Sequence, residues 1–400
     1  MLSMVLKGAR CAAIGMCAAC AMPSGAVNLV ATSSNLDATL SRMASGDTLS
    51  LAGTFGELRM TNRTFAKTVT IDASHAVFTT TMVFDNVRGI ALSGGTFNIA
   101  GNGAYAKGIA VYNGANVYID GVTVIGSADG TIDQFGVAVN GTNNAQVTNS
   151  NFSGLYSGIG YGSVVGGFIA KNTFTAATSD GIDIADSHGV TAVVNKCSGG
   201  RPGPGSHPDC IQMWSVAGKP LESDIVVSNN TAYGPTQGFT NFDAGLRITI
   251  TNNTVMSTYS AGVACYSCID SNISYNTIST LPGAPYQSHV SIAGGINNTV
   301  IGNVVAPYVE PPHSSIGAVG DGLLLGSYDE PAFSLDVLRP TGGNTGLAPW
   351  MSSNRAALSE SEIGAVPEPS TWGLLISGFA AVGIARRRTL MKVGRSTTVR

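Results

Sequence analysis

One short pattern recurs through the middle of the chain and restricts the folds that it can adopt. Apolar residues followed by Asn occur with spacings of 21, 23, 35, 23 and 23 residues, at Asn151, Asn172, Asn195, Asn230, Asn253 and Asn276. A period of about 22 residues is typical of one coil of a right-handed parallel β-helix, and the spacing of 35 is one coil plus an insertion at Gly199 to Pro208. Because side-chain amides satisfy backbone groups at turns, we interpret the Asn residues as a turn ladder.

The repeats also alternate apolar and polar residues, as strands with one face on a core do. The residues predicted to stack inward are Ile159, Ile182, Ile211, Phe239 and Val263, with Tyr161, Ile184, Met213, Asn241 and Cys265 two positions later. The residues predicted to face outward between them are Gly160, Asp183, Gln212, Thr240 and Ala264. We therefore predict an all-β fold, a single-stranded right-handed parallel β-helix (solenoid).

Composition supports this fold. Gly accounts for 51 of 400 residues and charged residues for 11%, which suits many short strands joined by tight turns. An amphipathic segment, Leu36 to Met43, precedes the first expected strand at Gly46 to Leu51, and we predict that it forms an N-terminal helical cap over the open core. The formal net charge of -3 offers no basic field, so we exclude nucleic acid as a partner.

The N-terminus has the features of a secretory signal peptide. Lys7 and Arg10 precede the apolar run Cys11 to Met22, and small residues follow, so we predict cleavage before Val27 and export of the chain. Lipidation at Cys20 is a weaker alternative, because the residues before it lack the usual aliphatic side chain. After Val305 the repeat fades, and we expect a C-terminal cap and a linker over residues 306–365.

The C-terminus carries an ordered set of signals: Pro367-Glu368-Pro369, Trp372, the apolar run Gly373 to Ala385 and Arg386-Arg387-Arg388. This set resembles the PEP-CTERM sorting tail of Gram-negative bacteria. The resemblance implies recognition by an exosortase at the inner membrane and placement at the cell surface; a lone membrane anchor helix is the alternative. The predicted segments are 1–26 signal peptide, 27–88 cap and first coils, 89–305 β-helix, 306–365 cap and linker, 366–388 sorting segment and 389–400 tail.

Cysteine usage agrees with an oxidising compartment. Cys197 and Cys210 flank the insertion, and a disulfide between them would close the loop Ser198 to Asp209. Cys265 and Cys268 have the spacing of a redox or zinc pair, but no second pair or His-x-x-x-His completes a metal site. We predict a structural bridge or two separate thiols there.

Two aspartate motifs one repeat apart form the candidate site. Asp180-Gly181-Ile182-Asp183 and Asp209-Cys210-Ile211-Gln212 would stack about 4.8 Å apart, and the insertion delivers His207 beside them. Paired carboxyl groups and a histidine suit acid–base catalysis.

Four further residues are candidates for substrate binding. Lys196 and Arg201 can neutralise a uronate carboxylate, Gln212 lies beside Asp183, and Trp214 can stack on a sugar ring. Alternatively Asp180 and Asp209 only cap turns, and with strict alternation Asp180 would point inward unless the chain bends there.

Residues Gly89 to Val305 resemble the parallel β-helices of the pectin-lyase-like superfamily. Within them, Asp180-Gly181-Ile182-Asp183 and Asp209-Cys210-Ile211 are similar to the polygalacturonase motifs, which would make both aspartates catalytic. Pro208 replaces the proton donor of that family, Gln237-Gly238-Phe239 stands where Gly-His-Gly would be, and no Arg-Ile-Lys follows.

The resemblance therefore implies a lyase, hydrolase or epimerase acting on an acidic polysaccharide rather than a plain polygalacturonase. The alternative is a non-catalytic matrix or adhesion protein. We expect a monomer without a required cofactor, although an outer carboxylate cluster can hold Ca²⁺, as in some lyases of this fold.

Overall fold

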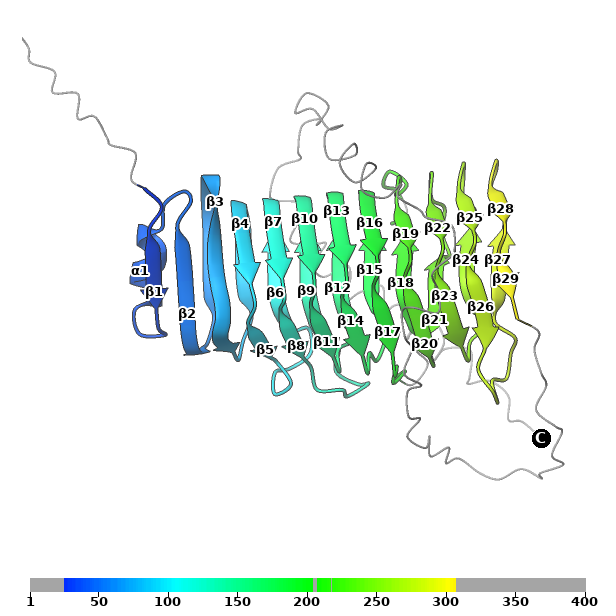
Figure 1. Cartoon of the computed structure of the whole chain (residues 1–400), viewed down its shortest axis with the longest axis horizontal. Coiled ribbons are helices and arrows are strands. Elements are labelled where there is room, and N and C mark those ends of the chain that lie inside the picture. The colour runs from blue at the N-terminus through cyan, green and yellow to red at the C-terminus, as the bar shows by residue number, and fades with distance from the viewer. Residues whose placement is uncertain (1–24, 204–206, 217, 307–400) are drawn as a thin grey trace, which may run out of the picture. The chain divides into compact units, whose positions relative to one another are not determined.

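The computed structural model describes residues 25–203, 207–216 and 218–306, which form one parallel β-solenoid (Figure 1). Each strand pairs in parallel with the equivalent strand one coil earlier and one coil later, so the strands stack in columns. The fold is all-β, with one short helix in the described part of the chain. No helix there is long and apolar enough to cross a membrane. Most of the predicted signal peptide, and the predicted linker and sorting segment, lie outside the described residues.

Three columns make up the repeating part of the solenoid. The first column comprises β6 (Lys107–Tyr112), β9 (Phe135–Asn140), β12 (Ser157–Gly162), β15 (Ile182–Ala185), β18 (Asp209–Trp214), β21 (Gln237–Asn241), β24 (Ala261–Tyr266) and β27 (His289–Ala293). The second comprises β7 (Ala115–Asp120), β10 (Asn143–Thr148), β13 (Val165–Ala170), β16 (His188–Val193), β19 (Val226–Ser228), β22 (Thr249–Thr251), β25 (Asn272–Ser274) and β28 (Thr299–Ile301). The third comprises β5 (Thr96–Asn98), β8 (Thr123–Ile125), β11 (Asn151–Ser153), β14 (Thr173–Thr175), β17 (Lys196–Ser198), β20 (Thr231–Gly234), β23 (Thr254–Ser257), β26 (Thr277–Thr280) and β29 (Val304–Val305).

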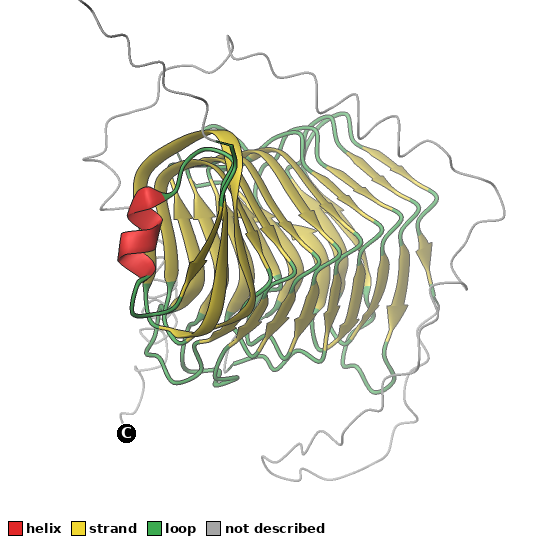
Figure 2. Cartoon of the chain, turned by 60° about the vertical axis from the view of Figure 1, so that its left-hand side comes forward, coloured by secondary structure: helices red, strands yellow, loops and turns green. Residues whose placement is uncertain are grey.

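The N-terminal end is built from longer strands and the helix. These elements are β1 (Asn28–Ala31), α1 (Leu36–Arg42), β2 (Thr48–Phe55), β3 (Leu58–Phe78) and β4 (Met82–Ser93). The predicted helix is confirmed and lies at this end, with Leu36 and Leu40 buried (Figure 2). The prediction that the helix precedes the first strand is wrong, because β1 comes before it and pairs with β2.

The predicted inward residues form the core. Ile159, Ile182 and Ile211 are in register and fully buried. The predicted outward residues are also in register, but the expectation that all of them reach solvent is wrong. Thr240 and Ala264 are 0% exposed, whereas Gly160, Asp183 and Gln212 are half-buried. The outer face of the first column is therefore partly accessible to solvent at Gly160, Asp183 and Gln212, and it is buried in the next two coils, at Thr240 and Ala264.

The Asn ladder is confirmed, but it begins at Asn172 and not at Asn151. In each step the side-chain Oδ1 of one Asn accepts hydrogen bonds from the backbone N–H and the Nδ2 of the Asn one coil earlier. The ladder runs through Asn172, Asn195, Asn230, Asn253, Asn276 and Asn303. Asn151 is not part of it, because it pairs with Thr173 and Ser150 takes the ladder position. Full pairing lets these amides lie in the interior.

A second turn position stacks residues with left-handed backbone conformation. Most are residues that tolerate it, such as Asn149 and Asn229, with φ of 52° and 57°. Val194 has φ of 58° in the same column, although a β-branched residue is a genuine outlier there. Its side chain is 42% exposed and adds little to the core. The turn geometry is thus imposed on Val194 by the coils on either side.

Replacing Val194 should therefore stabilise the fold. We expect Val194→Asn to raise the free energy of unfolding by about 1 kcal/mol, since Asn adopts this conformation at lower cost. Urea denaturation would measure the change. Asn229→Val, the converse change one coil later, should destabilise by a similar amount; equal stability of both variants and wild type would contradict the explanation.

Candidate active site

The chain bends at one position of the first column, and the bend places the predicted acids outside the core. Glycine occupies this position in most coils, at Gly108, Gly136, Gly158, Gly181, Gly238 and Gly262. A Cβ atom at Gly181 would lie 2.7 Å from Sγ of the buried Cys197, so this position faces the core, and the next residue, Ile182, does so too. Two successive inward positions break the alternation. Asp180 and Asp183 can therefore both face outward.

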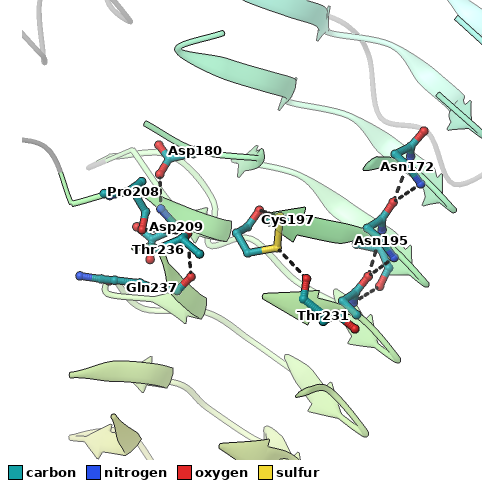
Figure 3. The surroundings of a disulfide bond; sticks show 12 residues. Asn172, Asp180, Asn195, Cys197, Pro208, Asp209, Thr231, Thr236 and Gln237 are labelled. Carbon is teal, nitrogen blue, oxygen red and sulfur yellow. Dashed lines mark hydrogen bonds between the residues drawn. A yellow bond between two sulfur atoms is a disulfide. The ribbon is translucent and has the colours of Figure 1, made fainter. Parts of the chain in front are cut away.

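Cys210 stands where the other coils carry glycine, and its sulfur occupies the space inside the bend. It forms a disulfide with Cys197, with the Cα atoms 5.5 Å apart (Figure 3). Cys197 belongs to the third column, where it stacks between Phe174 and Ala232. The disulfide thus joins the first column to the third and closes the insertion that carries His207. A second disulfide joins Cys265 and Cys268 within the core, which favours a structural role.

Asp180 is held by the coil that follows it. Its Oδ1 accepts a hydrogen bond of 2.7 Å from the backbone N–H of Asp209 (Figure 3). Its Oδ2 accepts one of 3.0 Å from Ser179 Oγ. Its side chain is buried. The structure therefore brings Asp180 and Asp209 together: the carboxylate of Asp180 contacts the backbone of Asp209.

Asp209 and Asp183 are linked to the neighbouring coils by hydroxyl groups. Thr240 Oγ1 donates to Asp209 Oδ1 at 2.8 Å, and Ser157 Oγ donates to Asp183 Oδ2 at 2.6 Å. Asp209 Oδ2 is buried and has no hydrogen-bond donor among the described residues; His207 Nδ1 lies 3.9 Å from it. The side chain of Asp209 is 0% exposed and that of His207 is 55% exposed. His207 thus lies between the buried carboxyl group and solvent.

The three carboxyl groups raise one another's pKa. Burial, and then the charge of Asp209, raises the pKa of Asp180 to about 7. Burial raises the pKa of Asp209 to about 6, although His207 and Thr240 oppose the shift. Burial and the nearby Asp180 hold the pKa of Asp183 well above its ordinary value. Such a group of acids titrates as a coupled unit and releases its protons at a higher pH than an ordinary aspartate does. The carboxylate of Asp209 in turn raises the pKa of His207.

The residues predicted to bind substrate divide into two sets. Gln212 pairs with Asp183 in the first column, and Trp214 lies two residues later on the same strand, so both belong to the outer face of the site. Lys196 lies in the third column between Thr173 and Thr231, which is a different column from the carboxyl groups. Arg201 is exposed in the insertion, where its backbone N–H donates to Ala177 O.

Four residues near the carboxyl groups were not among the predicted site residues. Ser157 and Gln237 occupy the position of Asp180 and Asp209 in the coils on either side, and comparing the coils at this position would have found them. Thr240 was predicted in the outward column of Asp183, but its hydrogen bond to Asp209 was not. Tyr156 had no such signal; burial, and then the charge of Asp180, raises its pKa to about 12. Tyr156 therefore stays protonated and can donate a hydrogen bond.

A small cavity lies behind Asp209, lined in part by Gly181, Cys197, Pro208 and Thr236. It has room for about one water molecule. Among the described residues, no group of three or more His, Cys, Asp or Glu side chains is arranged to hold a metal ion. We therefore derive no step that uses Ca²⁺.

Residues 365–388 match the PEP-CTERM protein-sorting motif. The motif indicates sorting to the cell surface by an exosortase, and it coincides with the predicted sorting segment. No curated protein matches the chain.

Several solved structures are similar to the solenoid. An alginate lyase from Paenibacillus sp. str. FPU-7 is 18% identical, covers 70% of this chain and 99% of its own, and has a TM-score of 0.43. The family 28 exopolygalacturonase of Yersinia enterocolitica is 11% identical, with coverages of 69% and 76% and a TM-score of 0.46. PfbA, a surface adhesin of Streptococcus pneumoniae, is 12% identical, with coverages of 68% and 84% and a TM-score of 0.41. The predicted parallel β-solenoid is confirmed by the strand pairings, and we base the function on the site itself.

Removing the disulfide of the insertion should weaken the fold measurably. We expect Cys197→Ser/Cys210→Ser to lower the free energy of unfolding by about 3 kcal/mol, because the disulfide closes a loop of 13 residues. Cys265→Ser/Cys268→Ser opens a much shorter loop, so its loss should be smaller in the same urea denaturation. A larger effect of the second pair would contradict this ranking.

The raised pKa values predict a fall in stability as the pH rises. The pKa of Asp180 is about 7 and that of Asp209 about 6, whereas an aspartate of the unfolded chain has a pKa of about 3.9. The folded state therefore binds these protons more tightly than the unfolded state does. The stability that this adds is fully present below pH 4 and is lost as the pH rises through 6 and 7. Between pH 5 and 8 the free energy of unfolding should fall, and Asp180→Asn/Asp209→Asn should reduce the fall by at least about 1 kcal/mol.

A matched variant controls for the loss of a carboxyl group. Asp224 is exposed and pairs with Arg247, which lowers its pKa, so Asp224→Asn should leave the slope between pH 5 and 8 unchanged. Part of the slope should survive in the double variant, because the pKa values of Asp183 and Glu222 are also raised by burial. Equal slopes in wild type and the double variant would refute the assignment.

Proposed function

We propose that this chain is an exported β-solenoid that modifies an acidic, uronate-containing polysaccharide by acid–base chemistry, as a lyase, hydrolase or epimerase. The observation that carries the proposal is the group formed by Asp180, Asp183 and Asp209 on the outer side of the first column, with His207 beside it. A purely structural carboxylate is usually ionised and paired with a cation or with several N–H donors. Here burial raises the pKa of all three carboxyl groups, and no cation pairs with Asp180 or Asp183 among the described residues.

The raised pKa values suit the steps that these reactions have in common. Elimination and epimerisation begin when a base takes the proton at C5 of a uronate. In elimination the C4–O4 bond then breaks, a C4=C5 double bond forms, and an acid protonates O4. Hydrolysis instead needs a carboxylic acid to protonate the glycosidic oxygen and a carboxylate to act on the other side. His207 is the group closest to solvent and is suited to exchange a proton with the sugar, and the carboxylate of Asp209 behind it stabilises the protonated imidazole.

The outer face of the first column offers a path for a polymer. Its middle coils carry the small residues Ala138 and Gly160 directly before Asp183 and Gln212, and all four are half-buried. A Cβ atom added at Gly160 would meet nothing within 4 Å, so space is free above it. We infer that the glycan runs along the column, with Gln212 and Trp214 contacting the sugar. Arg201, exposed in the insertion, would supply positive charge for the uronate carboxylates, whereas Lys196 lies in the third column, away from this path.

Several predictions about the whole chain belong to this proposal. The solenoid is right-handed and monomeric, residues 1–26 are removed on export, and residues 306–365 form a cap and a linker. Residues 366–388 direct the protein through the inner membrane of a Gram-negative bacterium to the cell surface. The sorting motif supports the last point. A surface enzyme in this position would meet polysaccharides of its own or another cell.

One observation favours a non-catalytic matrix or adhesion protein instead. Both oxygens of Asp180 accept hydrogen bonds from the fold, one of them from a backbone N–H, as expected if Asp180 only fixes the bend. Asp209 is also fully buried. On this alternative the chain binds polysaccharide without changing it.

Activity measurements distinguish the two functions. The exported protein, residues 27–362, would be incubated with pectate, alginate, hyaluronan and the exopolysaccharide of its host. Ultraviolet absorbance reports unsaturated uronates, reducing ends report hydrolysis, and NMR reports epimerisation. We expect activity on at least one polymer, and Asp209→Asn should lower it by at least about 100-fold, because the carboxylate that stabilises protonated His207 is lost.

Asp224→Asn is the matched control and should retain full activity, because Asp224 is exposed and pairs with Arg247. Circular dichroism at the assay pH would show that each variant is folded. Full activity of a folded Asp209→Asn would rule out its catalytic role. Binding without any chemical change to the polymers would support the adhesion function.

A further inference from the structure

A buried carboxylate holds the start of the first strand to the rest of the N-terminal cap. Asp47 directly precedes β2 and is only 4% exposed. Its Oδ1 accepts a hydrogen bond of 2.9 Å from the backbone N–H of Val27, and its Oδ2 accepts one of 2.8 Å from the backbone N–H of Ala44. The side chain therefore joins the residue before β1 to the loop between α1 and β2.

No cation compensates the charge of Asp47 among the described residues. None of their ion pairs includes it. Arg63 lies beside the same loop, but its guanidinium group donates to the carbonyl oxygens of Leu40 and Met43 instead. Burying a carboxylate that accepts hydrogen bonds only from neutral N–H groups is unfavourable, and a cation beside it would offset much of that cost.

Strand pairing fixes the position of Val27 next to this carboxylate. The carbonyl oxygen of Val27 accepts a hydrogen bond from the backbone N–H of Thr48, the first residue of β2, and the pairing of β1 with β2 starts at the next residue. The nitrogen of Val27 is held 2.9 Å from Asp47 Oδ1 as a result. Cleavage before Val27, which the sequence predicts, would turn this same nitrogen into the N-terminus of the exported protein.

We propose that removal of residues 1–26 creates an ion pair between the α-ammonium group of Val27 and Asp47, and that this ion pair locks the N-terminal cap. Hydrolysis of the bond between Ala26 and Val27 consumes one water molecule and leaves a carboxylate on Ala26 and an ammonium group on Val27. An α-amino group has an ordinary pKa of about 7.7–8.0, so the new N-terminus is cationic at neutral pH. The hydrogen bond to Asp47 becomes charge-assisted, which makes it roughly twice as strong. The inference rests on the predicted cleavage site and not on the proposed activity.

Hydrogen exchange tests the proposal on two forms of the protein that differ only at the N-terminus. One form begins at Val27 and the other at Gly25, which leaves the nitrogen of Val27 as a neutral amide. Each is released from a fusion partner by a protease that cuts directly before the chosen residue. Peptides covering β1 and α1 should exchange at least about ten-fold more slowly in the form that begins at Val27. In Asp47→Asn the two forms should exchange alike, because the negative charge is lost.

A matched variant controls for the loss of a carboxyl group in the cap. Asp37 is exposed on α1, so the two forms should still differ in Asp37→Asn. Peptides covering β15 and β18 serve as the internal reference and should exchange alike in every sample. Mass spectrometry of the exported protein should find Val27 as its first residue.

Three results would overturn the proposal. The first is an exported protein that begins at another residue. The second is equal exchange of the two forms when Asp47 is intact, a comparison that needs no substitution and so does not depend on the folding of a variant. The third is a difference between the two forms that persists in Asp47→Asn, which would show that the new N-terminus acts through another group.

Discussion

In-register stacking of parallel strands is the constraint on which the rest of this structure depends. Every residue of a coil lies about 4.8 Å from its equivalents in the coils before and after. A side chain that stabilises one coil therefore stabilises the fold again when it is repeated in the next coil. The Asn ladder shows this, because each amide accepts hydrogen bonds from the backbone and the side chain of its neighbour. Stacking also holds an unfavourable residue in the conformation of its neighbours. Val194 keeps a left-handed backbone conformation because the coils around it have the same turn.

The same stacking explains why the candidate site is electrostatically unusual. Two aspartates at equivalent positions of adjacent coils must lie close together, and a third follows three residues after the first. Their mutual repulsion adds to the cost of burial, and their hydrogen bonds to Ser157, Ser179 and Thr240 bring hydroxyl groups but no positive charge. The raised pKa values follow from the repeat itself, and His207 reaches the cluster only because an insertion departs from the repeat.

Periodicity made the fold and the stacked columns predictable, because each coil repeats the same constraint. The pairings of Ile182 with Ile211 and of Asp183 with Gln212 follow from it directly. Local departures were harder to predict. The bend at Gly181 adds one inward residue, so strict alternation left the direction of Asp180 open. The shift at Asn151 arose because Ser150 replaces the ladder amide, and the contribution of Tyr156 depends on a turn outside the strands.

The disulfide between Cys197 and Cys210 makes the geometry of the site depend on the redox environment of the chain. It attaches one end of the insertion to the core of the third column, and sulfur replaces the hydrogen of the glycine found in the other coils. Thiols remain reduced before export and pair in an oxidising compartment. The loop that brings His207 to the carboxyl groups is consequently tied down only after the chain has left the cytoplasm. Oxidation would thus act as a maturation step, because the candidate site would be complete only some time after the chain has been synthesised.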